Sequence, residues 1–281
     1  MYIYQAFGLS ITADLKIIEC LPIKDTDRID VHILSGVVPD TIKENQNQLL
    51  INLPQIGKIL IENGVAISYM KHVDTHEDNL RLFLLGSAMG ALLQQRGYIV
   101  LHGNAISFDK KTCSIFVGNQ GAGKSTTAAW HYQQGASILA DDVCAIYFES
   151  DGKPYVIPSY PQLKLWKNST DLLNISTTPL RRLRAQDEKF ALPILESFSA
   201  KPLAIDRIIE IQQEHITEEN VKSGKKLSIL TKHSYRYHFL NRMGLTSAYS
   251  KSLMRLAGKV EMLTQNRPVL LEKKCERYEV I

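Results

Sequence analysis

The sequence predicts an α/β core that follows a small β-rich lobe. Two observations predict the core: a glycine-rich loop, GNQGAGKS at residues 118–125, and the short apolar runs on both sides of it. A third observation predicts the lobe, because several short strand-like segments precede residue 75 with no long helical pattern between them. We therefore expect a β-rich lobe at residues 1–75 and a core domain at residues 76–281.

The lobe is expected to consist of strands at residues 2–11, 30–34 and 49–53, and of a hairpin around Asn63-Gly64. An Asn-Gly pair between apolar runs is the usual signal of a tight two-residue hairpin turn.

A core helix is expected at residues 79–93, where apolar residues recur at helical spacing. Thr75 and Asp78 can form a capping box, and Gly97 can end the helix. The stretch contains Arg81 and is too short to span a bilayer, so it predicts a buried helix and no membrane segment. The apolar positions are Leu82, Leu85, Met89, Leu92 and Leu93.

Residues 98–108 and 112–117 are predicted to form a hairpin whose paired positions sum to about 220. This register places His102 opposite Gly118, at the start of the glycine-rich loop. A bulge at 103–104 would reverse the face that the histidine presents. The alternative is that His102 is a satisfied structural residue of the strand.

The loop has the pattern G-x-x-x-x-G-K-S, which binds phosphate when a buried strand precedes it and a helix follows. Both are predicted here, the helix at residues 123–134 with Gly135 at its end, and a second buried strand follows at residues 136–140. Glycines allow backbone N–H groups to converge on phosphate, and the helix N-terminus adds positive potential. A surface turn is the alternative. The predicted nucleotide-binding residues are Gly118, Asn119, Gln120, Gly121, Ala122, Gly123, Lys124, Ser125 and Thr126.

Asp141 and Asp142 follow that second strand, which we expect to end at this pair. A right-handed crossover would bring them to the same edge of the sheet as the loop. Adjacent strand residues point to opposite faces unless the chain bends. One of the two aspartates can bind magnesium through water, and the other is free to accept a proton. The alternative is an ordinary polar strand end.

These segments, LHGNAI, VGNQGAGKST and ILADDV, resemble the catalytic core of the HPr kinase/phosphorylase family, whose P-loop fold is akin to phosphoenolpyruvate carboxykinase. The resemblance implies an ATP- or GTP-dependent, magnesium-dependent serine kinase. It implies catalytic roles for His102, Lys124 and Asp142, with Asp142 as the base. Asp141 is then the expected magnesium ligand, together with Ser125. The sequence does not distinguish ATP from GTP.

The chain also departs from that family. Thr126 stands where family members usually have Glu, and PSYPQLKLW at residues 158–166 replaces their glycine-rich signature with its metal-binding Glu. The stretch 158–166, the opening YQAFGL at residues 4–9 and LRLFLLGSAMGALLQQRG at residues 80–97 look more like stand-alone HPr-kinase-like proteins, some of which accompany lasso-peptide biosynthesis. That resemblance implies phosphorylation of a precursor peptide on its C-terminal serine. The alternatives are a bifunctional HPr kinase/phosphorylase and a noncatalytic, nucleotide-gated peptide-binding module.

Charge is unevenly distributed along the chain. Residues 1–152 hold 11 Lys plus Arg against 16 Asp plus Glu, whereas residues 153–281 hold 22 against 13. The basic part has its densest clusters at residues 181–184 and 232–238, which can stabilise a triphosphate or a substrate carboxylate. Solvated helix faces are the alternative.

Composition predicts a cytoplasmic protein and leaves open whether the chain self-associates, whereas the partner, a peptide or small protein, is implied by the resemblance alone. No signal peptide is visible at the start, and four cysteines with no C-x-x-C pair predict neither zinc nor a disulfide framework. The aromatic residues form no nucleic-acid-binding motif, so nucleic acid is not an expected partner.

Overall fold

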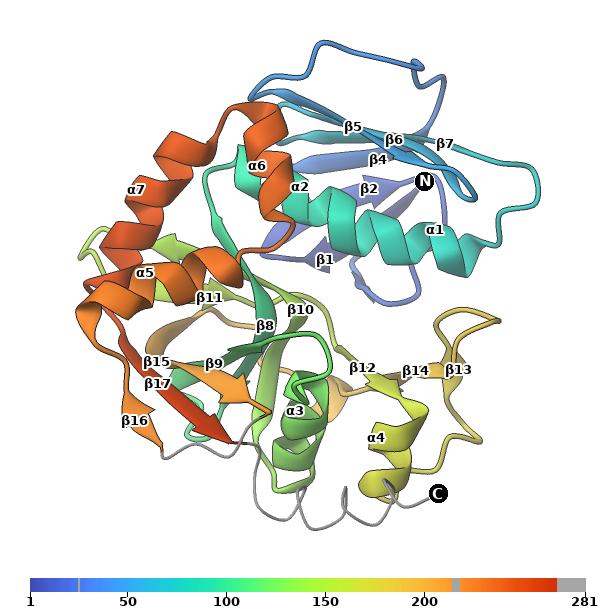
Figure 1. The fold of residues 1–281 in the computed structure, drawn as a ribbon. Coiled ribbons are helices and arrows are strands. Elements are labelled where there is room, and N and C mark those ends of the chain that lie inside the picture. The colour runs from blue at the N-terminus through green and yellow to red at the C-terminus, as the bar shows by residue number, and fades with distance from the viewer. Residues whose placement is uncertain (25, 214–217, 267–281) are drawn as a thin grey trace.

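The structure is a computed structural model that describes residues 1–24, 26–213 and 218–266 of the chain. Within these residues the strands form three sheets, two with seven strands and one with three, and helices pack around them (Figure 1). The chain is therefore a mixed α/β protein, as the sequence predicts.

The first sheet lies in the N-terminal part, with the strand order β3-β1-β2-β4-β7-β6-β5. The predicted hairpin joins β6 to β7 through Asn63 and Gly64, whose φ angles are 54° and 66°. Such positive values at both positions are typical of the tight turn that Asn-Gly favours. The strands are β1 Tyr2–Ala6, β2 Leu9–Ala13, β3 Leu21–Pro22, β4 Val31–Ser35, β5 Gln48–Leu53, β6 Gly57–Glu62 and β7 Ala66–Lys71.

The prediction of one strand over residues 2–11 is wrong. The chain reverses at Phe7 and Gly8, which have φ angles of 53° and 68°, and β1 pairs with β2. Phe7 has no accessible surface and packs edge-on against Tyr160, with 5.8 Å between the ring centroids. Its burial offsets a backbone conformation that residues with a Cβ rarely adopt. No local turn signal marks Phe7, which is why the sequence did not predict the reversal.

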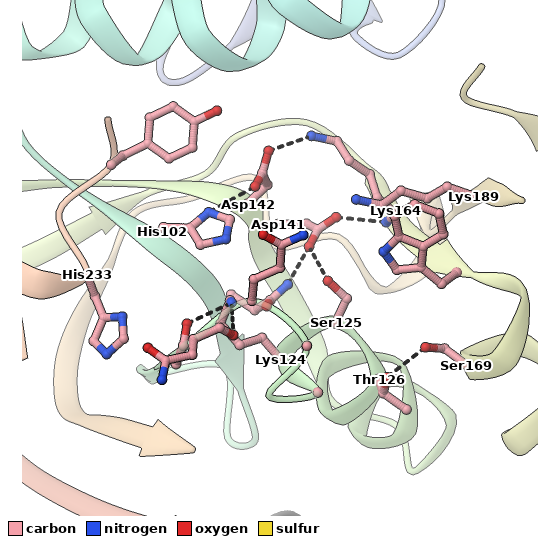
Figure 2. Close-up of a pocket in the computed structure, with 18 of the residues that line it drawn as sticks. His102, Lys124, Ser125, Thr126, Asp141, Asp142, Lys164, Ser169, Lys189 and His233 are labelled. Carbon is pink, nitrogen blue, oxygen red and sulfur yellow. Dashed lines mark hydrogen bonds and ion pairs between the residues drawn. The ribbon is translucent and has the colours of Figure 1, made fainter. Parts of the chain in front are cut away.

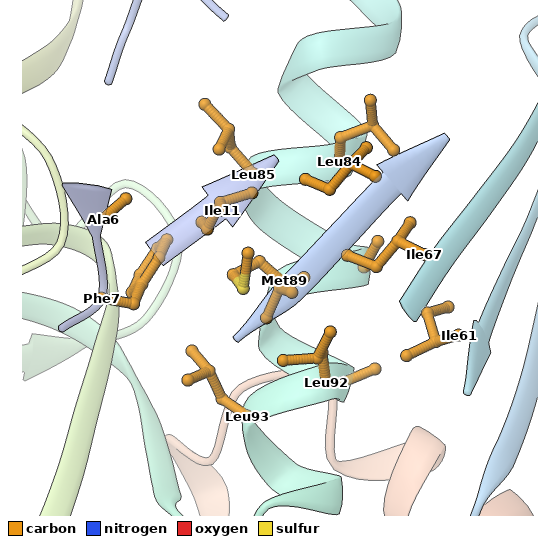
Figure 3. Packing of buried hydrophobic residues seen from close by; sticks show 14 of the residues in the cluster. Ala6, Phe7, Ile11, Ile61, Ile67, Leu84, Leu85, Met89, Leu92 and Leu93 are labelled. Carbon is orange, nitrogen blue, oxygen red and sulfur yellow. The ribbon is translucent and has the colours of Figure 1, made fainter. Parts of the chain in front are cut away.

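One face of this sheet is covered by a continuous helical segment: α1 (Glu77–Phe83), a π-helical turn (Leu84–Ala88) and α2 (Met89–Gln95). Isoleucines of the sheet pack against leucines and a methionine of the helix in one buried cluster (Figure 3). Each such side chain contributes roughly 1.5–3 kcal/mol when it is buried. The residues labelled in this cluster are Ala6, Phe7, Ile11, Ile61, Ile67, Leu84, Leu85, Met89, Leu92 and Leu93.

The ends of this helical segment agree only in part with prediction. Gly97 ends it, with a φ of 83° and an N–H that donates to the Gln94 carbonyl. The predicted capping box is wrong, because the N-cap is His76, whose Nδ1 accepts from the Asp78 N–H. Thr75 is buried, and its hydroxyl donates to the Ile56 carbonyl at 2.8 Å. A tertiary hydrogen bond has therefore replaced the local cap.

The second sheet has the order β11-β10-β8-β9-β15-β17-β16. The predicted register of β8 and β9 is confirmed, since Gly103 pairs with Val117 and no bulge interrupts the ladder. β9 and β10 both pair antiparallel to β8, so they run parallel to each other. The strands are β8 Ile99–Ser107, β9 Thr112–Gly118, β10 Ser137–Phe148, β11 Pro154–Ile157, β15 Leu203–Gln212, β16 Glu219–Asn220 and β17 Glu261–Asn266.

The second predicted strand does not end at the acid pair. β10 continues to Phe148, and Asp141 and Asp142 pair with Asn104 and Gly103 in the middle of the sheet. The apolar residues after the pair extend the strand, because their side chains are buried in the core. The two aspartates are therefore held by strand pairing on both sides of their position.

Helices cover both faces of the second sheet. α3 (Lys124–Gln133) packs its buried alanines, Ala128 and Ala129, against Phe116 and Ile138 on one face. The other face is covered by α5 (Ser223–Lys232) and α7 (Thr246–Ala257), which pack leucines against Leu101 and Ile115. α6 (Tyr237–Met243) contacts α2 and β5.

The third sheet is short and stands beside α3. It contains β12 (Gln162–Trp166), β14 (Lys189–Pro193) and β13 (Arg181–Arg182), with α4 (Lys167–Leu172) after β12 and a 3-10 turn at Leu195–Ser197. Arg181 of β13 forms ion pairs with Glu19 at 2.6 Å and with Asp78 at 2.9 Å. These contacts connect the third sheet to α1 and to the N-terminal part of the chain.

The predicted lobe boundary near residue 75 falls between β7 and α1. Residues on both sides of it share one hydrophobic cluster, which also includes Val100, Val143 and Tyr235. The division into two lobes stays a prediction. Among the described residues, no helix combines the length and the apolar character that crossing a lipid bilayer requires.

Candidate functional site

A cavity of about 1010 Å³ opens where β9 ends and β10 bends (Figure 2). Its wall is made by the glycine-rich loop, β10, the third sheet with α4, and the segment 232–236. The cavity brings together five residues that the sequence had singled out for catalysis or metal binding. These are His102, Lys124, Ser125, Asp141 and Asp142.

The glycine-rich loop has the geometry of a phosphate-binding turn. Gly121 and Gly123 have φ angles of 78° and 95°, and α3 begins at the following lysine, so the N-terminus of this ten-residue helix faces the cavity. A Cβ at Gly118 would lie 2.9 Å from the Ile211 carbonyl oxygen, so the neighbouring strand also requires glycine there. This arrangement presents partial positive charge to an anion.

The side chain of Lys124 turns back toward the start of the glycine-rich loop. Its Nζ donates to the carbonyl oxygens of Gly118 and Asn119 at 2.9 and 3.1 Å. The side chain is largely buried, and burial lowers the pKa of this lysine while the two aspartates act in the opposite direction. The ammonium group is therefore held at the mouth of the turn, where it can bind a phosphate.

Most of the predicted nucleotide-binding residues line the cavity. Ala122 does not, because its side chain is buried in the core beneath the loop. Thr126 lines the cavity, and its hydroxyl lies 2.8 Å from that of Ser169 in α4. The first turn of α3 is thus joined to α4, a contact that the sequence did not indicate.

Both aspartates face the cavity, although they are neighbours on a strand. Asp142 has a φ of 75°, and the ladder between β10 and β8 shifts register between Ile138 and Ala140. The positive φ of Asp142 breaks the alternation that would place the two side chains on opposite faces of the sheet. The bend allows the two carboxylates to act at one site.

Asp141 lies beside Ser125, the residue predicted to bind magnesium together with it. Its carboxylate is buried and accepts hydrogen bonds from the Lys164 N–H at 2.7 Å, the Ser125 hydroxyl at 3.3 Å and the Asn104 amide. Burial raises the pKa of Asp141, so a nearby cation would stabilise its charged form.

The residues present fit a magnesium ion held in part by substrate. The hydroxyl of Ser125 and the carboxylate of Asp141 are oxygen ligands of the kind that magnesium prefers. Among the described residues, no group of three or more His, Cys, Asp and Glu side chains could hold a metal by itself. Phosphate oxygens and water would have to supply the remaining ligands, which is the usual arrangement at nucleotide sites.

Asp142 is held between the side chains of His102 and Lys164. Its Oδ1 lies 3.0 Å from His102 Nδ1, and its Oδ2 lies 3.1 Å from Lys164 Nζ. Burial tends to raise the pKa of Asp142, but Lys164 and His102 outweigh burial and hold the pKa well below its ordinary value. Asp142 is therefore a charged carboxylate at neutral pH, and a quarter of its side chain is exposed to the cavity.

Lys164 is the site residue that sequence reasoning missed. It lies in the stretch 158–166, in which no site residue was predicted. Its side chain is almost fully buried, and its neighbours on the strand, Leu163 and Leu165, have no accessible surface. A lysine between two core leucines of a strand needs a buried anion, and that pattern could have revealed it.

The two basic clusters have different positions. In the first cluster, residues 181–184, Arg181 binds Glu19 and Asp78 away from the cavity, and Arg184 lines the cavity. In the second cluster, residues 232–236 line the cavity. Within the second cluster, His233 Nε2 lies 2.7 Å from the buried carboxylate of Glu210, and Lys232 Nζ lies 3.1 Å from it. The His233 carbonyl accepts from the His102 N–H at 2.8 Å, which positions the strand that carries His102.

Comparison with known proteins finds similarity at the level of structure. No protein-family model matches the chain, and no curated protein matches it in sequence. Among solved structures, the chain is similar to the Hpr(Ser) kinase/phosphatase from Coxiella burnetii, with a TM-score of 0.35 and 9% sequence identity. The match covers 64% of this chain and 90% of that chain. A similarity at this level does not assign the chain to a family.

Proposed function

We propose that the protein is a kinase that transfers the terminal phosphoryl group of ATP to a serine hydroxyl of a peptide. One observation carries this proposal: the phosphate-binding turn with Lys124 and the charged Asp142 face the same cavity. A phosphoryl donor and a proton acceptor are the two groups that kinase chemistry must bring together.

In the proposed reaction, the serine oxygen forms a bond to the terminal phosphorus while the bond from that phosphorus to the bridging oxygen of ADP breaks. The serine proton moves to the carboxylate of Asp142, and the electrons of the broken bond stay on ADP. His102 and Lys164 each hold one oxygen of that carboxylate, and each oxygen keeps a further lone pair for the proton.

The loop residues bind and orient the donor. Lys124 and the N-terminus of α3 stabilise negative charge on the phosphates, a stabilisation that is strong in a cavity with little water. Ser125 and Asp141 are the residues that would hold magnesium, which when bound neutralises phosphate charge. Catalysis in this class of reaction depends mainly on such positioning and electrostatic stabilisation.

The acceptor that we propose is the C-terminal serine of a lasso-peptide precursor, following the resemblance of the sequence. An acceptor of this kind has a carboxylate beside its hydroxyl. Arg236 supports this proposal, because it lies exposed at the cavity wall next to Tyr235 and forms no ion pair among the described residues. A guanidinium group binds carboxylates with two hydrogen bonds.

The direct test uses short peptides ending in serine, incubated with the protein, ATP and magnesium. Mass spectrometry is expected to show the added mass of one phosphoryl group, and chelation of magnesium by EDTA is expected to abolish the modification. The matched control is the same peptide with a terminal alanine. If the protein binds both ATP and the peptide but leaves the peptide unmodified, it is the noncatalytic binding module instead. Removal of phosphate from phospho-HPr by inorganic phosphate would indicate the bifunctional enzyme.

A further inference from the structure

Lys189 is a cation in the cavity that the mechanism above does not use. It lies at the start of β14 and pairs in register with Trp166 of β12. Figure 2 shows its side chain extending from the third sheet toward the two aspartates. Lys189 and Lys124 line the same cavity from different walls, one from the third sheet and one from α3.

The other cavity lysines have polar partners. Lys124 donates to two carbonyl oxygens, Lys164 binds Asp142, and Lys232 binds Glu210. Lys189 Nζ instead lies 5.4 Å from the centroid of the Trp166 ring, and no carboxylate pairs with it in the part of the chain that the structure describes. Contact with an aromatic face is a weak interaction for a cation. It leaves the charge of Lys189 available to an anion in the cavity.

Lys124 and Lys189 thus place two positive charges at one cavity. Two cations that repel each other across a cavity are both stabilised when a polyanion binds between them.

Resting on the proposed function, we propose that Lys189 is a second phosphate-binding cation. Its ammonium group leaves the face of Trp166 and binds the terminal phosphate of the nucleotide from the wall opposite Lys124, keeping its own proton throughout. In phosphoryl transfer, charge spreads over the equatorial oxygens of the transferring group, and a cation placed there stabilises the transition state. Lys189 is thus a catalytic residue that also favours ATP over ADP, because only ATP has a terminal phosphate for it to bind.

The test compares K189M, K189R and, as a matched control, K251M, which changes an exposed lysine on α7. Two kinds of measurement are made on each variant. Titration gives the affinities for ADP and for a non-hydrolysable ATP analogue, both with magnesium. Single-turnover kinetics gives the rate of peptide phosphorylation. K189M is expected to weaken analogue binding about 10-fold and ADP binding less than about 3-fold. Its transfer rate is expected to fall about 100-fold, the usual effect of removing one transition-state donor. K189R is expected to retain part of the preference for the analogue, and K251M all of it.

The two readouts separate this inference from the proposed function. If K189M keeps the wild-type preference for the analogue over ADP, the role of Lys189 is overturned, even when the wild-type protein phosphorylates its peptide. If the wild-type protein shows no transfer but its preference for the analogue depends on Lys189, the proposed reaction fails and the phosphate-binding role stands. A wild-type protein that binds neither nucleotide overturns both.

Discussion

Replacement of Asp142 by asparagine is expected to lower the rate of peptide phosphorylation at least about 1000-fold, while ATP affinity changes less than about 3-fold. Asparagine keeps the size of the side chain and one oxygen acceptor, but it cannot take the serine proton. The hydrogen bonds and ion pairs of the Asp142 carboxylate go to His102 and Lys164 and, among the described residues, none goes to the loop that would hold the phosphates. Binding of the donor and transfer of its phosphoryl group should therefore separate in this variant, as measured by nucleotide titration and single-turnover kinetics.

The D142N variant will also lose stability, because Lys164 remains buried without its carboxylate. Breaking a buried ion pair costs about 3–5 kcal/mol, which a urea unfolding curve can detect. Retained ADP affinity serves as the check that the site is folded. The matched control is D206N, at a half-exposed aspartate that pairs with Arg207 on the surface of β15. Transfer by D142N at the wild-type rate would remove Asp142 from the role of base.

The second large effect is expected for Lys124→Ala, which should weaken the binding of both ADP and ATP at least about 100-fold and leave transfer undetectable. The change removes the charge at the mouth of the loop, where Nζ donates to Gly118 and Asn119. Hydrogen bonds from a charged group to phosphate are among the strongest that proteins form, and a 100-fold loss corresponds to about 2.7 kcal/mol. Isothermal titration with each nucleotide measures the effect.

The exposed Lys251 again provides the control, as Lys251→Ala, which should bind nucleotides as the wild-type protein does. Lys124→Ala and D142N therefore differ in kind: the first loses binding and transfer together, the second transfer alone. Ordinary ADP affinity in Lys124→Ala would show that the glycine-rich turn is not a phosphate site.

The sequence was informative where local chemistry decides structure. The loop required glycines with positive φ angles between a buried strand and a helix, and the structure has them at Gly121 and Gly123. The hairpin register followed from counting residues on both sides of one turn, so it placed His102 beside the end of β9 correctly. These features depend on neighbours in the chain, which the sequence displays directly.

The rest of the site depends on contacts between distant segments. Lys164 and Lys189 come from β12 and β14, which pair residues more than twenty positions apart, and their place at the cavity follows from the packing of the third sheet beside α3. The sequence also did not predict that the strand bends at Asp142 so that both carboxylates face one cavity. A positive φ at an aspartate is uncommon and is held here by pairing on the strand and by the contacts of its carboxylate.

The central claim is that one cavity brings the terminal phosphate of a nucleotide to Asp142, and a crystal structure with a non-hydrolysable ATP analogue and magnesium tests it most directly. The expected result is a terminal phosphate within hydrogen-bonding distance of Lys124, on the cavity side that faces the Asp142 carboxylate. A nucleotide bound outside the turn of residues 118–125, or one whose terminal phosphate points away from Asp142, would contradict the claim.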